Sequence, residues 1–308
     1  MSKSGYVALI GRPNAGKSTL LNAVVGTQIS IVTPKAQTTR EQIQGILTEE
    51  KGQIVFVDTP GIHKAREGGL NEYMVKQAKD ALEAPNVIWY LVDPYSHLDH
   101  EKAVIELLED VKDTPIFVLL NKTDTLTCNA RTSKEKLEKA DALQKSLVEF
   151  FALKGIPIRK LERISATAND GVKELLQNTW DLIPEGPLFY PDPEQVSDRP
   201  TRFFVAEKVR EQLFRCLGDE VPYSCAVEVT SFKEDPKLAR IEATIHVERE
   251  SQKGIVIGQK GKKIKEIGQN AREEIEDFLE QKIFLGLKVE LSRNWTEQSQ
   301  ALKKMGYQ

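Results

Sequence analysis

The segment that most constrains this chain is Gly11–Ser18, which reads Gly-Arg-Pro-Asn-Ala-Gly-Lys-Ser and fits the pattern G-x-x-x-x-G-K-[ST]. An apolar run ends at Ile10, and a helical pattern begins near Ser18. In this context the glycines let the backbone wrap closely around an anion, and the N–H groups at the start of the helix point at it. The pattern predicts a loop that binds nucleotide phosphates through Gly11, Arg12, Pro13, Asn14, Ala15, Gly16, Lys17, Ser18 and Thr19.

A second motif, Asp58-Thr59-Pro60-Gly61, follows the apolar run 53–57. We expect the Asp58 carboxylate to lie near the Mg²⁺ that the Ser18 hydroxyl binds, and the Gly61 amide to lie near a γ-phosphate. The Lys17 ammonium is expected to reach the β- and γ-phosphates. Thr59, Pro60 and Ile62 complete the predicted surroundings of the nucleotide on this side.

Two later motifs bear on which base is bound. The motif Asn121-Lys122-Thr123-Asp124 follows the apolar run 115–120. The Asp124 carboxylate can accept hydrogen bonds from N1–H and the 2-amino group of guanine, whereas adenine has neither donor and would leave the carboxylate unpaired. Ser165 and Ala166 end another predicted strand and suit a backbone amide that reaches guanine O6. The motifs together predict GTP or GDP with Mg²⁺ as the cofactors.

Short apolar runs alternate with helical stretches between residues 6 and 184. We expect strands at 6–10, 53–57, 87–92, 115–120 and 163–165, and helices at 18–25, 71–82, 101–109 and 133–152. This alternation predicts an α/β domain at 1–183, with a mostly parallel sheet and helices on both faces. Five prolines at 184–200 mark an extended linker between two domains.

The overall composition narrows the class of protein. The hydrophobic content of 40% is ordinary for a globular chain, and no stretch approaches the roughly 18–20 apolar residues of a membrane span. The net charge is −3, so a surface for nucleic acid has to be a local basic patch. The three cysteines (Cys128, Cys216 and Cys225) form no C-x-x-C pair, which favours a reduced, cytoplasmic protein.

Residues 201–293 show a different order of elements, which predicts a small α+β domain. A helix at 201–217 precedes strands at 226–232 and 240–248, then a Gly/Lys-rich turn, a helix that ends near 279, and a strand at 284–291. The turn contains Gly258-Gln259-Lys260-Gly261, and a KH module uses such a G-x-x-G loop to clamp about four nucleotides of RNA. With a helix expected directly before this loop, the order of elements is α–β–β–α–GxxG–α–β, which resembles the type II KH fold.

Lysines without an intervening acid surround this loop and form a basic patch. We expect the apolar residues Ile255, Val256 and Ile257 to line a groove under the bases, and Ile264 and Ile267 to lie in the core. The predicted RNA-binding residues are Lys253, Gly254, Ile255, Val256, Ile257, Gly258, Gln259, Lys260, Gly261, Lys262, Lys263 and Lys265.

The phosphate loop and the segment Gln37-Thr38-Thr39-Arg40 resemble motifs of the bacterial Era family, in the translation-factor-like class of P-loop GTPases. The resemblance implies switch segments at about 30–44 and 58–72. It also implies that Thr39 senses Mg²⁺, although Thr38 stands beside it and the residues alone do not separate the two. By this resemblance the catalytic residues are Lys17, Thr39, Asp58 and Gly61, and the metal ligands are Ser18, Thr39 and Asp58.

Ile62 stands where many related GTPases carry a glutamine that orients the attacking water. Isoleucine has no polar atom, so we expect slow intrinsic hydrolysis, with the water positioned by backbone, a cation or an outside partner. Asn14 has two interpretations that the sequence leaves open. It is either a ligand of K⁺ beside the phosphates, as in some GTPases of this kind, or a turn residue.

The full order of domains, with a C-terminal tail at 294–308, resembles Era, and so do Val247–Lys253 and Ala301–Tyr307. The resemblance implies a monomeric factor that binds the 3′ end of 16S ribosomal RNA through its KH domain. It further implies a role in 16S rRNA processing and in assembly of the 30S subunit, with the GTP state controlling the grip on RNA. The alternative is a membrane-peripheral signalling GTPase, whose helix 201–217 or basic surface meets anionic lipid at the inner face of the cell membrane. A tRNA-modifying GTPase is less favoured, because no second chemical centre is evident.

Overall fold

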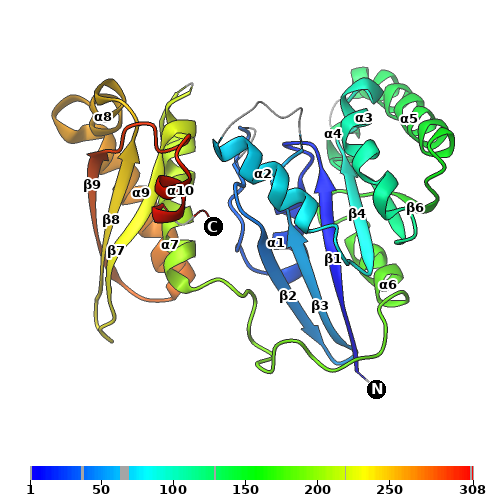
Figure 1. Ribbon diagram of the computed structural model, residues 1–308, viewed down its shortest axis with the longest axis horizontal. Coiled ribbons are helices and arrows are strands. Elements are labelled where there is room, and N and C mark those ends of the chain that lie inside the picture. The colour runs from blue at the N-terminus through cyan, green and yellow to red at the C-terminus, as the bar shows by residue number, and fades with distance from the viewer. Residues whose placement is uncertain are drawn as a thin grey trace. The chain divides into compact units, whose positions relative to one another are not determined.

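The structure is a computed structural model that describes residues 2–35, 38–62, 69–127, 130–218, 220–305 and 307. The contacts between residues divide the chain into two compact units (Figure 1). The main boundary lies between Asp198 and Arg199, and the described residues of two short segments, 31–38 and 67–72, are grouped with the C-terminal residues. Parts of both expected switch segments, residues 36–37 and 63–68, lie outside the described residues, and so do Cys128 and Gly306. The N-terminal and C-terminal units are described separately.

The N-terminal unit is built on a six-stranded sheet in the order β2-β3-β1-β4-β5-β6, in which only the pair β2 and β3 is antiparallel. Its strands are β1 (Lys3–Gly11), β2 (Ile43–Glu49), β3 (Gly52–Asp58), β4 (Val87–Val92), β5 (Ile116–Leu120) and β6 (Ile158–Arg163). Its helices are α1 (Lys17–Val25), α2 (Gly69–Asp80), α3 (Leu98–Leu107), α4 (Asp124–Thr127), α5 (Ala130–Leu153) and α6 (Val172–Trp180), with a 3-10 turn at Glu109–Val111.

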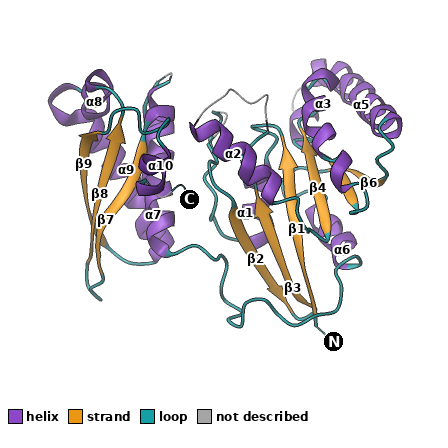
Figure 2. Ribbon diagram, in the orientation of Figure 1, coloured by secondary structure: helices purple, strands orange, loops and turns teal. Residues whose placement is uncertain are grey.

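Strands β4 and β5 are apolar throughout, and all of their residues are buried. On one face of the sheet, Tyr90 belongs to a core cluster with residues of α3 and α5. On the other face, Trp89 donates a hydrogen bond to Thr179 of α6 at 3.1 Å. Figure 2 shows the helices and strands of this unit by type. Burial on both faces explains why these strands read as unbroken apolar runs. The predicted α/β class of the N-terminal unit is confirmed.

Both edge strands of this sheet differ from the expectation. Strand β6 spans Ile158–Arg163 and not 163–165, so Ser165 follows the strand. Strand β2 was not expected, and it begins at Ile43, inside the predicted first switch segment. Edge strands are partly exposed and carry mixed polar and apolar residues, so they lack the continuous apolar run that marks a central strand.

The proline-rich segment 184–198, which we call the strap, is hydrogen-bonded to the N-terminal unit. The Gln53 side chain on β3 is fully buried. Its Oε1 accepts hydrogen bonds from the amides of Phe189 and Tyr190, both at 2.9 Å, and its Nε2 donates to the Tyr190 carbonyl at 3.1 Å. A buried amide side chain thus fixes the middle of the strap.

The end of the strap pairs with β2. The Ile46 amide donates to the Val196 carbonyl at 2.9 Å, and the Ser197 hydroxyl donates to the Gln44 carbonyl at 2.5 Å. An edge strand has backbone groups without a sheet partner, and the strap supplies partners for them. The expected extended connector is therefore held against the N-terminal unit over most of its length.

The C-terminal unit has a three-stranded sheet in the order β7-β8-β9, with β7 antiparallel and β9 parallel to β8. Its strands are β7 (Ala226–Lys233), β8 (Ala239–Val247) and β9 (Ile283–Leu291). Its helices are α7 (Thr201–Cys216), α8 (Glu250–Ile257), α9 (Lys262–Leu279) and α10 (Ser299–Lys304), with 3-10 turns at Val221–Ser224 and Gln259–Gly261. The predicted α+β class of this unit is confirmed.

Helix α7 contributes its apolar side to the core of its own unit. Val205, Val209 and Leu213 are fully buried and belong to one cluster with Ile241 of β8. The apolar stripe of the predicted helix 201–217 is therefore already covered. In the part of the chain that the structure describes, no helix has both the length and the apolar composition needed to cross a membrane.

The expected C-terminal tail packs onto the C-terminal unit. The buried Trp295 indole donates to the Ser224 carbonyl at 3.0 Å and stacks on Tyr307 with 5.7 Å between ring centroids. A buried indole N–H needs such a partner. The described residues beyond β9 are thus part of the folded unit.

Candidate nucleotide-binding site and nucleic-acid interface

The phosphate loop connects β1 to α1. Gly16 has a φ of 97°, and a Cβ at this position would lie 2.2 Å from Asn121 Nδ2, so only glycine fits. Lys17 is nearly buried, and its ammonium donates to the carbonyls of Gly11 at 3.1 Å and Arg12 at 3.0 Å. The Lys17 ammonium is therefore held by backbone carbonyls within the phosphate loop, where the sequence predicts that nucleotide phosphates bind.

A cluster of oxygens lies beside the loop. The Ser18 hydroxyl donates to Asp58 Oδ2 at 2.7 Å and lies 3.0 Å from the Thr39 hydroxyl. The Ser30 hydroxyl donates to the same Asp58 oxygen at 3.0 Å. Asp58 Oδ1 is buried and has no hydrogen-bond partner among the described residues. Carboxylate and hydroxyl oxygens are the ligands that Mg²⁺ prefers, so this donor set fits the ion.

Thr38, the other candidate for sensing the metal, has different contacts. Its hydroxyl donates to the Lys35 carbonyl at 2.8 Å and lies 2.8 Å from the Thr33 hydroxyl. Of the two adjacent threonines, Thr39 is the one that meets Ser18.

Burial shifts the pKa values of both charged residues of this cluster. Burial lowers the pKa of Lys17 to about 8, and the carboxylates of Asp58 and Glu101 oppose that shift. Burial raises the pKa of Asp58, against the opposing effects of Lys17 and of the hydroxyls of Ser18 and Ser30. A buried cation and a buried anion lie close together, and bound phosphate and metal would supply each with an opposite charge.

The guanine motif is joined to the phosphate loop by Asn121, which is almost fully buried. Its Nδ2 donates to the Ala15 carbonyl at 2.9 Å, and its Oδ1 accepts from the Ala166 amide at 3.0 Å. The Ser165 hydroxyl donates to Asp124 Oδ1 at 2.6 Å and so orients the carboxylate that is predicted to read guanine. The phosphate loop and both base motifs are thus brought together.

The two amides that were expected to reach guanine O6 already have acceptors. The Ser165 amide donates to the Asp170 carbonyl at 3.0 Å, and the Ala166 amide donates to Asn121. The contact of one of these amides with guanine O6 stays a prediction.

Gly61 and Ile62 lie against the phosphate loop. A Cβ on Gly61 would lie 2.5 Å from Pro13 Cα, so glycine permits this close approach. The Ile62 side chain is buried in the core cluster, and its amide donates to the Gly11 carbonyl at 3.1 Å. Ile62 therefore offers a backbone contact to the loop, while its side chain points away from the predicted reaction.

The remaining predicted nucleotide-site residues surround these motifs. Some are buried, some are partly exposed and Asn14 is exposed with a left-handed φ of 63°. The buried ones are Ala15, Thr59 and Pro60, and the partly exposed ones are Arg12, Pro13, Thr19, Lys122 and Thr123. Two residues at the site were not singled out from the sequence: Ser30, which contacts Asp58, and Glu101, which acts on Lys17.

The G-x-x-G loop of the C-terminal unit connects α8 to α9. Gly258, Lys260 and Gly261 have φ values of 69°, 51° and 76°, a left-handed backbone that glycine adopts readily. Gln259, Lys260, Lys262 and Lys265 are exposed, and Lys253 is partly exposed. Lys263 forms an ion pair with Glu266 at 2.8 Å, so its charge is partly neutralised within the protein.

The apolar residues near this loop are arranged differently from the expectation. Val256 is fully buried in the core, Ile257 packs against that core and Ile255 is half exposed. The expectation that these residues line one groove is wrong, because residues 250–257 form helix α8 and successive side chains of a helix point in different directions. Ile267 is in the core as expected, and Ile264 packs against that core while it also lines a groove.

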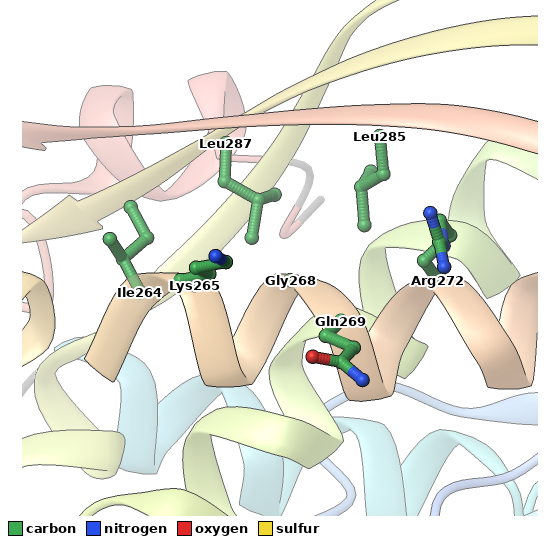
Figure 3. Close-up of a pocket in the computed structure, with 7 residues that line it drawn as sticks. All are labelled: Ile264, Lys265, Gly268, Gln269, Arg272, Leu285 and Leu287. Carbon is green, nitrogen blue, oxygen red and sulfur yellow. The ribbon is translucent and has the colours of Figure 1, made fainter. Parts of the chain in front are cut away.

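This groove lies between α9 and β9 and holds about 380 Å³ of space, which is within the range of small-ligand pockets. A Cβ on Gly268 would lie 3.3 Å from Leu287 Cδ1, so a side chain there would narrow the groove. Figure 3 shows the residues that line it, namely Ile264, Lys265, Gly268, Gln269, Arg272, Leu285 and Leu287. The i, i+4, i+8 spacing of Ile264, Gly268 and Arg272 was a signal in the sequence that they share a helix face.

Comparison with known proteins decides the family. A family model described as "50S ribosome-binding GTPase" matches residues 6–122, and a model described as "KH domain" matches residues 220–296. The GTPase Era of Geotalea uraniireducens is 45% identical over 308 residues, which cover 99% of this chain and 98% of that protein. The chain belongs to the Era family of GTPases.

Solved Era structures match the whole chain. A crystal structure of a variant of Aquifex aeolicus Era bound to GDP·AlF4⁻ has a TM-score of 0.88 and 34% identity, and it covers 99% of each chain. An Era structure in complex with MgGDPNP and nucleotides 1506–1542 of 16S ribosomal RNA has a TM-score of 0.87 and 34% identity, and it covers 100% of this chain and 99% of that one. The resemblance to Era that the sequence motifs indicated is confirmed.

Proposed function

We propose that this Era GTPase is a GTP-controlled clamp on ribosomal RNA. It binds GTP with Mg²⁺ in the N-terminal unit, hydrolyses it to GDP and phosphate, and holds the 3′ end of 16S ribosomal RNA in the KH unit during maturation of the 30S subunit. The observation that supports the switch is the 3.0 Å approach of the Thr39 and Ser18 hydroxyls beside Asp58 Oδ1, which has no hydrogen-bond partner among the residues that the structure describes. The relative in complex with MgGDPNP and a 16S rRNA fragment supports the choice of ligands.

The proposed nucleotide contacts follow from the positions of the side chains. Lys17 and the amides of the phosphate loop hold the β- and γ-phosphates. Ser18, Thr39 and Asp58 hold Mg²⁺, which when bound neutralises charge on the phosphate oxygens. Asp124, oriented by Ser165, accepts hydrogen bonds from guanine.

Hydrolysis is proposed to be slow without a partner. The Gly61 amide is proposed to donate to a γ-phosphate oxygen as negative charge develops there, and the close approach of Gly61 to Pro13 of the phosphate loop supports this contact. The Ile62 side chain is buried and carries no polar atom, so it cannot orient the attacking water. The attacking water is instead oriented by backbone groups, by a cation such as K⁺ near Asn14, or by an outside partner.

The proposed RNA surface joins the G-x-x-G loop to the groove beside it. The exposed charges of Lys260, Lys262 and Lys265 suit phosphates of the RNA backbone, which approach closely because the loop glycines lack side chains. The apolar wall formed by Leu285 and Leu287 suits the face of an unstacked base, and Arg272 adds positive charge at the groove. Single-stranded RNA offers both features at once.

The strap offers a path from the nucleotide to the KH unit. Thr39 lies shortly before β2, and the strap is bonded to Gln44 and Ile46 of that strand. The strap ends at Asp198, and α7 begins at Thr201. Ordering of Thr39 by GTP and Mg²⁺ would therefore act on β2 and, through it, on the segment that leads into the KH unit.

Salt-dependent RNA binding tests the proposal. We expect a labelled single-stranded RNA with the sequence of the 16S 3′ end to bind, with affinity that falls as salt rises. Lys262→Glu should weaken binding about tenfold or more, and Lys145→Glu, an exposed change on α5, should leave it unchanged. Equal affinity of the wild type and Lys262→Glu would contradict the proposed RNA surface.

A further inference from the structure

Glu101 is a buried carboxylate beside the phosphate loop that has no role in the contacts proposed above. It lies in the first turn of α3 and is 1% exposed. Its Oε2 accepts a hydrogen bond from the Tyr90 hydroxyl at 2.6 Å, and its Oε1 accepts one from the Ser96 hydroxyl at 2.5 Å. Burial of a carboxylate costs folding free energy unless nearby hydrogen bonds and charges compensate it. The groups around Glu101 therefore indicate which part of the protein it stabilises.

Glu101 is connected to the phosphate loop through Ser96. Arg12 Nη1 donates to the Ser96 hydroxyl at 3.4 Å, so Ser96 stands between the guanidinium and the carboxylate. The guanidinium of the loop and the buried Glu101 carboxylate therefore share Ser96 as a common hydrogen-bond partner.

Ser96 belongs to a turn at residues 93–98, whose other end reaches the guanine motif. The Ser96 amide donates to the Asp93 carbonyl at 2.9 Å, and the Tyr95 amide donates to Asp93 Oδ1 at 2.9 Å, which closes the turn. Asp93 Oδ2 forms an ion pair with Lys122 at 2.8 Å. Lys122 has a left-handed φ of 60° within Asn-Lys-x-Asp, so its ion pair supports an uncommon backbone conformation.

We propose that the turn 93–98 is a bracket that sets the spacing between the phosphate loop and the guanine motif, with Glu101 and Asp93 as positioning residues. A nucleotide has a limited distance between base and phosphates, so it gains both sets of contacts only when the two motifs are correctly spaced. Glu101 acts through Ser96 on Arg12, and Asp93 acts through Lys122. This bracket rests on the proposed nucleotide site and adds determinants of its affinity and base selectivity.

Two charge-removing variants of similar size, Glu101→Gln and Asp93→Asn, test the bracket. We would measure the Kd of the full chain for GDP and for inosine diphosphate, which lacks the 2-amino group that Asp124 is proposed to recognise. Each variant should bind GDP about tenfold more weakly, the size expected for a lost hydrogen bond to a charged group. Asp93→Asn should also lower the preference for GDP over inosine diphosphate about threefold or more, because Asp124 is then less well placed.

The control is Asp99→Asn, which removes an exposed carboxylate from the same turn of α3, where it pairs with Lys102 at 2.6 Å. It should keep the affinity of the wild type for GDP. Ser96→Ala cuts the link to Arg12 without leaving a large cavity, and it should weaken GDP binding about threefold even if Glu101→Gln fails to fold.

An unchanged GDP affinity and an unchanged preference for GDP in Asp93→Asn and Ser96→Ala, with only the melting temperature lowered, would overturn the bracket. Failure of the wild type to bind GDP would instead overturn the proposed nucleotide site. The two failures are therefore distinguishable in one set of measurements.

Discussion

The hydroxyl oxygens of Ser18 and Thr39 lie 3.0 Å apart, and Ser18 also donates to Asp58 at 2.7 Å. Ser18 belongs to the phosphate loop, whereas Thr39 belongs to the expected first switch segment. A metal ion held by all three side chains would fix the switch segment to the loop when GTP is bound.

Replacing Thr39 by Val keeps the shape of the side chain and removes the hydroxyl. GTP hydrolysis should fall by about 100-fold, because a ligand that stabilises charge in the transition state is lost. Thr38→Val is the matched control, since its hydroxyl contacts Thr33 and the Lys35 carbonyl, and it should keep most of the activity. Single-turnover hydrolysis in excess Mg²⁺ measures both. A larger loss in Thr38→Val than in Thr39→Val would contradict the assignment.

The two interpretations of Asn14 predict different responses to monovalent cations. If its side chain helps to hold K⁺ beside the phosphates, turnover should be several-fold faster in K⁺ than in Na⁺ at equal ionic strength, and Asn14→Ala should remove the difference. Equal rates of the wild type in the two buffers would leave Asn14 as a turn residue, in keeping with its left-handed φ of 63°.

The C-terminal unit should lose stability as the pH rises toward neutral. Glu211 on α7 has its pKa raised to about 7 by burial, against the opposing charge of Arg215. Glu274 raises this pKa further, and Lys208 opposes it. A carboxyl with a raised pKa in the folded state holds a proton that the unfolded chain has already released. The stability it contributes is therefore present at low pH and is lost as the pH rises through about 7.

Glu211→Gln removes this titration. We would measure the free energy of unfolding of both proteins by calorimetric melting at pH 5 and at pH 8. The difference, variant minus wild type, should be about 1–2 kcal/mol larger at pH 8 than at pH 5. A difference between the two proteins that does not change with pH would show that Glu211 stays charged in the folded state.

The strap should couple nucleotide state to RNA binding. Ser197→Ala removes the hydrogen bond of 2.5 Å to the Gln44 carbonyl, at a cost in stability of about 1 kcal/mol. It should also reduce the difference in RNA affinity between the GTP-bound and GDP-bound forms, while leaving GDP affinity unchanged. Ser231→Ala on β7 is the matched control. A full nucleotide effect in Ser197→Ala would exclude the strap as the path of coupling.

Much of the nucleotide site could be predicted because its motifs are contiguous in sequence and follow strands. Parallel strands end at the same edge of a sheet, so Asp58 and Asn121 had to lie near the phosphate loop once the strands were recognised. Ser30 and Glu101 could not be found in this way, because they reach the site through loops and helices whose paths depend on packing. The same is true of the strap, whose partner β2 carries no continuous apolar run.

The RNA surface was only partly predictable. The loop glycines and lysines stand together in the sequence, whereas the groove combines one face of α9 with alternate residues of β9. These two elements meet because β9 pairs in parallel with β8. The local sequence pattern does not reveal which strands pair in the tertiary structure. The error over Val256 has the same origin, since the side of the short helix before the loop that faces the core depends on tertiary packing.

The central claim is that GTP controls the grip on RNA, and one measurement tests it most directly. It is the Kd of the full chain for a 16S 3′-end RNA fragment with GDP and with a non-hydrolysable GTP analogue. Gly258→Asp serves as the variant that disrupts the loop, because a Cβ there would lie 2.5 Å from Lys263 Cβ. We predict tighter binding with the analogue than with GDP, and loss of binding in the variant. Equal affinity in the two nucleotide states would contradict the claim and leave two independent binding modules on one chain.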